Sequence, residues 1–97
     1  MMATQTKILT VEGLQITDAK GEVRARIIVT PYGGVGFSLA DNKGQSRAMM
    51  IVSSDGTVSF RLFDDKGIRA GMGLNPDGSP GITLFDEKGK IIWSATK

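Results

Sequence analysis

Apolar and polar residues alternate along almost the whole chain from Leu14 onward, a pattern typical of β-strands with one buried face. Thirteen glycines lie at regular intervals, so no window is left for a helix. We predict an all-β fold, an antiparallel meander of about eight strands. The expected strands are 14–17, 22–30, 34–40, 45–53, 57–63, 68–74, 80–85 and 90–95. Residues 7–11 also have a strand-like composition, and 1–6 are expected to be frayed.

The strands fall into four copies of one unit. Each copy contains an aspartate followed three residues later by a glycine, and the aspartates are Asp18, Asp41, Asp64 and Asp86. The steps between them are 23, 23 and 22 residues, a period that indicates a supersecondary unit repeated in tandem. The sequence therefore predicts four hairpin repeats in one domain that spans residues 1–97.

Two kinds of turn separate the strands. Within each repeat the turn follows the pattern Asp-x-Lys-Gly, in which the aspartate side chain starts the turn and the glycine supplies a positive φ. Between repeats lie three-residue hairpin loops, each a type I turn followed by a glycine bulge. These loops are Pro31-Tyr32-Gly33, Ser54-Asp55-Gly56 and Pro76-Asp77-Gly78.

The loop length predicts the strand register, because directly opposed residues share a face of the sheet. With a three-residue loop, Val29 faces Val35 and Ile27 faces Phe37. The same loop length pairs apolar residues in the other two hairpins, and a slip of one residue would pair them with polar ones. The expected pairs are Val29–Val35, Ile27–Phe37, Ala25–Leu39, Val52–Val58, Met50–Phe60, Ala48–Leu62, Leu74–Pro80, Met72–Ile82 and Ala70–Leu84.

One face of the predicted sheet is apolar and must be buried against something. We expect oligomerisation to bury it, with a three-fold prism favoured, while a closed eight-stranded barrel is the alternative. The oligomer face is predicted to include Ala25, Ile27, Val29, Phe37, Leu39, Met50, Phe60, Leu62, Met72, Leu84 and Trp93. Further residues expected on it are Leu14, Ile16, Val23, Ile68 and Ile91.

The repeat resembles one found in uncharacterised short bacterial proteins, which carry tandem hairpins of the form L-x-L-x-D-x-x-G-x-x-R-A joined by x-D-G loops. The matching residues here are Leu39, Asp41, Gly44, Arg47 and Ala48, then Leu62, Asp64 or Asp65, Gly67, Arg69 and Ala70. The likeness covers the chain from about Leu14 to its end. The last copy departs from the pattern, with Ile92 and Trp93 in place of Arg and Ala. The resemblance implies an oligomeric β-hairpin repeat and no activity.

Composition argues against catalysis. The chain has no cysteine and no histidine, which removes disulfides, thiolate chemistry, common zinc sites and histidine acid–base catalysis. We therefore predict no enzyme, catalytic residue, cofactor or metal. The four turn aspartates would lie roughly 10 Å apart on alternate strand pairs, too far to share a calcium ion. Without an apolar leader or spanning segment, the expected location is the cytoplasm, away from membranes.

The opposite face mixes arginines with apolar residues. Arg24, Arg47 and Arg69 recur at one repeat position, and Arg47 and Arg69 are expected opposite Phe63 and Phe85 as cation–π pairs. Possible binding residues on this face are Arg24, Arg47, Arg61, Arg69, Phe63 and Phe85. With a net charge of only +2, nucleic acid is not an expected partner.

We therefore predict a non-enzymatic structural or protein-interaction module whose partner is a copy of itself, in a trimer. Two alternatives remain open. One is a small barrel that binds an apolar ligand, since eight strands can enclose one. The other is a weak polyanion or nucleic-acid binder that uses the arginine face.

Overall fold

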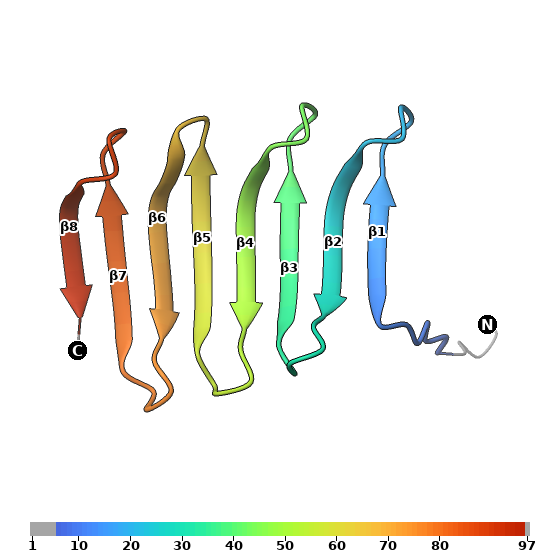
Figure 1. Cartoon of the computed structure of the whole chain (residues 1–97), viewed down its shortest axis with the longest axis horizontal. Coiled ribbons are helices and arrows are strands. Elements are labelled where there is room, and N and C mark those ends of the chain that lie inside the picture. Colours follow the sequence, from blue (N-terminus) through green and yellow to red (C-terminus); the bar gives the residue numbers. More distant parts are fainter. Residues whose placement is uncertain (1–5, 97) are drawn as a thin grey trace, which may run out of the picture.

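The computed structural model describes residues 6–96 and contains a single antiparallel sheet of eight strands in sequence order (Figure 1). The predicted all-β meander is confirmed. The strands are β1 (Gly13–Thr17), β2 (Val23–Val29), β3 (Val35–Ala40), β4 (Ser46–Val52), β5 (Val58–Asp64), β6 (Gly67–Leu74), β7 (Pro80–Phe85) and β8 (Ile91–Thr96). Among the described residues there is no helix that could cross a membrane.

The predicted register is confirmed in all three hairpins that the short loops connect. Val29 pairs with Val35 and Ile27 with Phe37 between β2 and β3. The pairs expected between β4 and β5, and between β6 and β7, occur in the same way. The alternation of apolar residues therefore fixes the register, because every strand presents its apolar side chains to the same face.

The three-residue loops close as expected. The Thr30 amide donates a hydrogen bond to the Gly34 carbonyl at 2.7 Å, and the Gly33 amide donates to the Thr30 carbonyl at 3.1 Å. Gly33 has a φ of 88°, the left-handed conformation that a side chain would disfavour. The other two loops repeat these bonds, so one local design makes all the turns at the lower end of the sheet in Figure 1.

Each repeat also contains a β-bulge beside its Asp-x-Lys-Gly turn. Leu39 pairs with Ala48, but the adjacent Ala40 pairs with Ser46, so Arg47 is the extra residue. The corresponding extra residues in the other repeats are Arg24, Arg69 and Ile92.

The bulges correct one prediction about the apolar face. Ile68 pairs with Phe63, and its side chain lies 3.6 Å from a Cβ built on Gly71, which is on the opposite face. Val23 and Ile91 occupy the same repeat position. The expectation that Val23, Ile68 and Ile91 belong to the apolar face is wrong, because the extra residue in each bulge reverses the alternation.

One further expectation is wrong. The sheet does not close, since β1 and β8 form opposite edges, and the barrel alternative therefore fails (Figure 1). Residues 7–11 form no strand and are exposed, despite their strand-like composition. A strand needs a neighbour to accept its hydrogen bonds, and pairing with β2 reaches only as far as the Glu12 carbonyl, which accepts from Val29 at 3.0 Å.

Candidate functional site

The main surface feature is the apolar face, where three rows of side chains run across the sheet. In each row, every residue is paired with the one on the neighbouring strand. None of the row residues carries a charge. The rows are Ile16, Ala25, Leu39, Ala48, Leu62, Ala70, Leu84 and Trp93; Leu14, Ile27, Phe37, Met50, Phe60, Met72, Ile82 and Ala95; and Val29, Val35, Val52, Val58, Leu74 and Pro80.

No described part of the single chain covers these rows. Among the described residues no hydrophobic side chain is buried, and even Phe37, in the middle row, is 39% exposed. Thirteen of the sixteen residues predicted for the oligomer face lie in the three rows, and the exceptions are Val23, Ile68 and Ile91. The structure thus brings together the residues that the alternation singled out, including Trp93 on the edge strand β8.

The whole chain is correspondingly extended. It exposes 7645 Å², whereas a compact monomer of this mass would expose about 5,400 Å². Its radius of gyration is 16.7 Å, against about 12.5 Å for a compact domain of this length. The excess area exceeds the roughly 800 Å² that each partner contributes to a standard protein interface.

A second feature is the turn aspartates, which hold the loops at the upper end of the sheet. Asp41 Oδ1 accepts hydrogen bonds from the amides of Lys43 and Gln45, at 2.9 and 3.0 Å. Asp18 and Asp86 do the same in their own turns. The predicted turn-forming role of these aspartates is confirmed.

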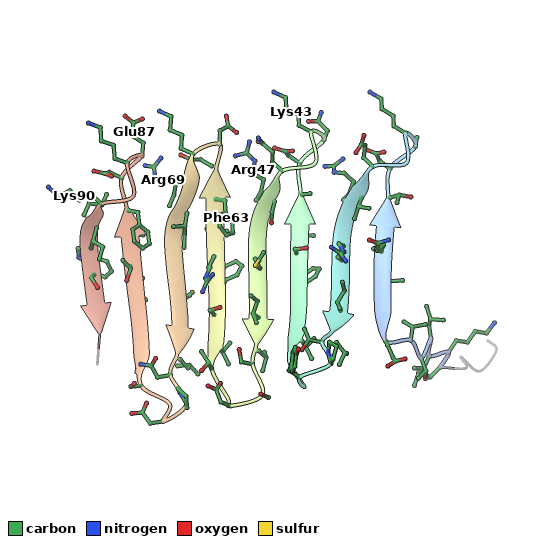
Figure 2. The ribbon with its side chains drawn as sticks, in the orientation of Figure 1. Lys43, Arg47, Phe63, Arg69, Glu87 and Lys90 are labelled. Atoms are coloured by element: carbon green, nitrogen blue, oxygen red, sulfur yellow. The ribbon has the colours of Figure 1, made fainter. Side chains whose placement is uncertain are left out.

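The bulge arginines bind these same aspartates. Arg47 donates from Nε to Asp41 Oδ2 at 2.8 Å and from Nη2 to Asp65 Oδ1 at 2.5 Å. In the next repeat, Arg69 Nη1 donates to Asp64 Oδ2 at 2.6 Å. Figure 2 shows Arg47 and Arg69 beside the turns. The bulge is the cause of this arrangement, since it places an extra residue where its side chain can return to the turn.

Each bulge arginine also crosses to the following strand. Arg69 Nε donates to the Phe85 carbonyl at 2.9 Å, and Arg47 Nη1 reaches the Phe63 carbonyl at 3.5 Å. Arg24 Nε makes the equivalent bond to the Ala40 carbonyl at 2.9 Å. The arginines do lie beside the predicted phenylalanines, but the observed contacts are hydrogen bonds to the backbone, which the cation–π expectation did not include.

These contacts shift the pKa values of the carboxyl groups. Hydrogen bonds from the Gln45 and Lys43 amides and from Arg47 lower the pKa of Asp41 below its ordinary value. The pKa of Asp64 is lowered chiefly by Arg69. In the three-residue loops, the amides of Thr57 and Ser79 lower the pKa values of Asp55 and Asp77. The charges at the sheet ends therefore stabilise the turns that carry them.

Most arginines of the predicted binding face already form ion pairs with aspartates of the same chain. Arg24, Arg47 and Arg69 are each within 4 Å of an aspartate, although the Arg24–Asp18 pair is loose at 3.8 Å. Within residues 6–96, Arg61 has no such ion pair and its side chain is exposed. Phe63 and Phe85 are half-buried. The arginine row is thus paired with carboxylates, which compete with any phosphate ligand.

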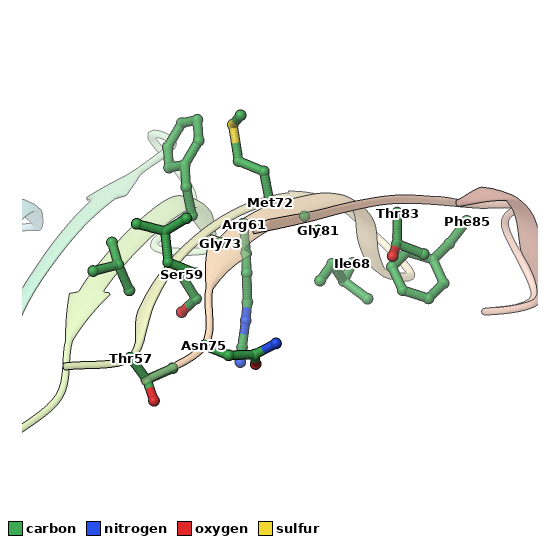
Figure 3. A pocket seen from close by; sticks show the side chains of 14 residues that line it. Thr57, Ser59, Arg61, Ile68, Met72, Gly73, Asn75, Gly81, Thr83 and Phe85 are labelled. Atoms are coloured by element: carbon green, nitrogen blue, oxygen red, sulfur yellow. The ribbon is translucent and has the colours of Figure 1, made fainter. Parts of the chain in front are cut away.

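The same face carries an open groove of about 440 Å³ over β6 (Figure 3). Gly71, Gly73 and Gly81 are among the residues that line it. Arg61 and Phe85 contribute to its lining. Figure 3 shows Arg61 pointing away from Met72, so the groove lies opposite the apolar face. It can accept a flat or narrow surface against the bare backbone.

Gly73 has a steric role that its sequence position did not reveal. A Cβ built on Gly73 would overlap the Val58 carbonyl oxygen, a contact that no real side chain tolerates. Gly36 differs, because a Cβ there would meet no atom within 4 Å. Only the close approach of β5 to β6 distinguishes these two strand glycines.

In the described part of the chain, no three acidic residues lie close enough together to hold a metal ion. The adjacent pairs Asp64–Asp65 and Asp86–Glu87 lie at the ends of strands, where Asp64, Asp65 and Glu87 are bound to Arg69, Arg47 and Lys66.

Comparison with known proteins adds no assignment. No protein-family model matches the chain, and no curated protein matches it either. The resemblance of the repeat to the short bacterial hairpin proteins therefore stays a prediction.

Proposed function

We propose that the chain is a non-enzymatic structural module that assembles with copies of itself, three together, by burying the apolar face. The observation that carries the proposal is the set of three uncharged rows, open to solvent along the whole sheet. Soluble monomers rarely expose apolar patches larger than a few hundred square ångströms, and a sheet with one apolar face needs a cover.

The character of the face favours a copy of this chain as the cover. A partner of different chemistry is usually held partly by charge complementarity, but the rows contain no charged residue. Another copy offers a surface of the same width and the same apolar character. Fully burying one large apolar side chain contributes roughly 1.5–3 kcal/mol. The rows contain fifteen large apolar residues that are exposed in the single chain, so their burial can stabilise both the fold and the assembly.

The mass in solution tests this proposal. We expect light scattering at micromolar concentration to give about three times the 10.3 kDa mass of the chain. Phe60→Asp places an unpaired charge in the middle row and is expected to dissociate or unfold the assembly. The matched control is Ser59→Asp, which adds the same charge to the neighbouring residue on the opposite face. A wild-type mass of 10.3 kDa, or equal effects of the two variants, would contradict the proposal.

A further inference from the structure

We propose that the copies are joined edge to edge, with β8 of one chain hydrogen-bonded to β1 of the next and Ser94 opposite Gln15 of the partner subunit. This inference rests on the proposed self-assembly and adds the contact that joins the subunits. It is carried by three observations: the chemistry of the two edge strands, the direction of their free backbone groups, and the register of the internal repeats.

The edge strands lack the features that normally prevent edge pairing. Proteins protect exposed edges with prolines, charged side chains or irregular short strands. Neither β1 (Gly13–Thr17) nor β8 (Ile91–Thr96) contains a proline or a charged residue. The charged residues Glu12 and Lys90 stand just outside them. Both edges therefore remain able to accept another strand.

The free backbone groups point in the required direction. The Glu12 carbonyl accepts a hydrogen bond from the Val29 amide of β2. Hydrogen-bonded residues alternate along an antiparallel strand. Leu14 and Ile16 therefore face β2, while the amide and carbonyl of Gln15 point outward from the sheet. On β8, the repeat places Ser94 at the position of Arg26, whose backbone faces the following strand β3.

The internal repeats supply the register. β8 corresponds to β2 and β1 corresponds to β3, because their residues hold the same positions relative to the Asp-x-x-Gly turns. Arg26 pairs with Ser38 between β2 and β3. Transferred to the edges, this pair becomes Ser94 with Gln15 of the partner subunit. The flanking pairs become Trp93 with Ile16 of the partner subunit, and Ala95 with Leu14 of the partner subunit.

This register matches the side chains on both faces. Two apolar rows continue from one sheet into the next through the Trp93 and Ala95 pairs. On the other face, Ser94 lies 3.5 Å from Thr83 through the two hydroxyl oxygens, and the amide of Gln15 extends this polar row. β1 and β8 run in opposite directions, so the junction is antiparallel like every other pair in the sheet (Figure 1).

The contact joins two different surfaces, so it leads either to a closed ring or to an open filament. The proposed three-fold assembly corresponds to a ring in which each sheet forms one side. In such a ring no edge strand is left unpaired, which would also explain why neither edge is protected.

Disulfide trapping tests this contact directly, because the natural chain contains no cysteine. Cα atoms of a hydrogen-bonded antiparallel pair lie about 5.5 Å apart, within the range that a disulfide spans. In Gln15→Cys/Ser94→Cys, oxidised glutathione should therefore link the chains. β1 and β8 of one chain are separated by about 34 Å of sheet, so any link must be intermolecular. A ring of three predicts a ladder on non-reducing gels that ends at three chains.

The matched control is Thr17→Cys/Ser94→Cys, which uses the same strands but is two residues out of register. Diagonal residues lie about 7–8 Å apart, so we expect this variant to cross-link about tenfold less. A second measurement needs no substitution. In the wild-type protein, the amide hydrogens of Gln15 and Ser94 should exchange as slowly as those of the internal strand β4, because both are hydrogen-bonded only across the junction.

The outcomes separate this inference from the proposed function. An oligomeric mass without cross-links, together with fast exchange at both amides, would overturn edge pairing and leave face burial standing. Equal cross-linking of the two double variants would overturn the register. A monomeric wild type would overturn both the edge contact and the proposed assembly.

Discussion

Asp41 Oδ2 lies 2.8 Å from Arg47 Nε, and the other oxygen of the same carboxylate accepts the amides of Lys43 and Gln45. One side chain therefore joins the turn to the bulge that follows it. Asp64 and Arg69 repeat the arrangement at 2.6 Å. The turn and the bulge are thereby fixed to each other in these two repeats.

We predict that Asp41→Asn is nearly neutral, whereas Asp41→Ala lowers the thermal unfolding midpoint by several degrees. Asparagine retains an oxygen for the two amides and loses only a half-buried ion pair at the surface, which contributes little. Alanine loses both the acceptor and the pair. Thermal unfolding followed by circular dichroism, at one protein concentration, would check the order. Arg47→Ala serves as a control that removes the pair but keeps the turn bonds, and a larger loss in Asp41→Asn than in Asp41→Ala would contradict the assignment.

Stability should fall only under acidic conditions. The pKa values of Asp41, Asp55, Asp64 and Asp77 are lowered in the folded chain from an ordinary value of 3.8. Their ionised forms stabilise the fold above that pH, and this stabilisation is lost as the pH falls through 3.8 toward the folded pKa values. With no histidine in the chain, we expect little change in the unfolding midpoint between about pH 5 and 8. A steep change across that range would contradict this account.

Replacing two strand glycines by alanine should change the free energy of unfolding in opposite directions. Gly73→Ala forces a Cβ against the Val58 carbonyl and should cost about 3 kcal/mol in the free energy of unfolding, or prevent folding. Gly36→Ala has free space and should stabilise by roughly 0.5 kcal/mol, because alanine loses less backbone entropy. Urea unfolding of both variants at equal concentration would measure the contrast. If the two variants changed the free energy of unfolding similarly, β5 would not lie as close to Gly73 of β6 as described.

Trp93 should report on assembly, since it is the only tryptophan and lies on the apolar face. Its side chain is 50% exposed in the single chain. Burial between copies should therefore shift its emission to shorter wavelength and protect it from acrylamide quenching. Phe60→Asp should reverse both effects, while Ser59→Asp should retain them. Equal quenching in wild type and Phe60→Asp would place Trp93 outside the interface.

Much of the fold follows from the sequence because the alternation is strict and the loops are short. A three-residue loop leaves one register in which Met50 meets Phe60, and the structure has that register. Predicting the bulges takes a comparison of two registers, one set by the turn and one set by the apolar pairs. The Asp18 turn places Thr17 opposite Val23, whereas the pairing of apolar residues places Ile16 opposite Ala25. These two registers differ by one residue. Counting from both ends of each hairpin would have located the extra arginine.

The remaining features depend on three-dimensional proximity. Nothing local distinguishes Gly73 from Gly36, because the difference lies in how closely β5 approaches β6. The pairing of Arg47 with Asp65 joins residues 18 positions apart and depends on the bulge that directs the arginine side chain. The strand-like residues 7–11 have no partner strand within the sheet, which composition alone could not show.

Each strand contacts only the strands beside it in sequence. Both ends of a repeat are also fixed locally, by the short loop on one side and by the bulge on the other, where the first three repeats add an arginine. A whole repeat could therefore be gained or lost without changing the register of the rest, much as in solenoid proteins. Each repeat adds two strands, or roughly 9.6 Å of sheet width. In the proposed assembly, the number of repeats would therefore set the width of each sheet and so the size of the enclosed space.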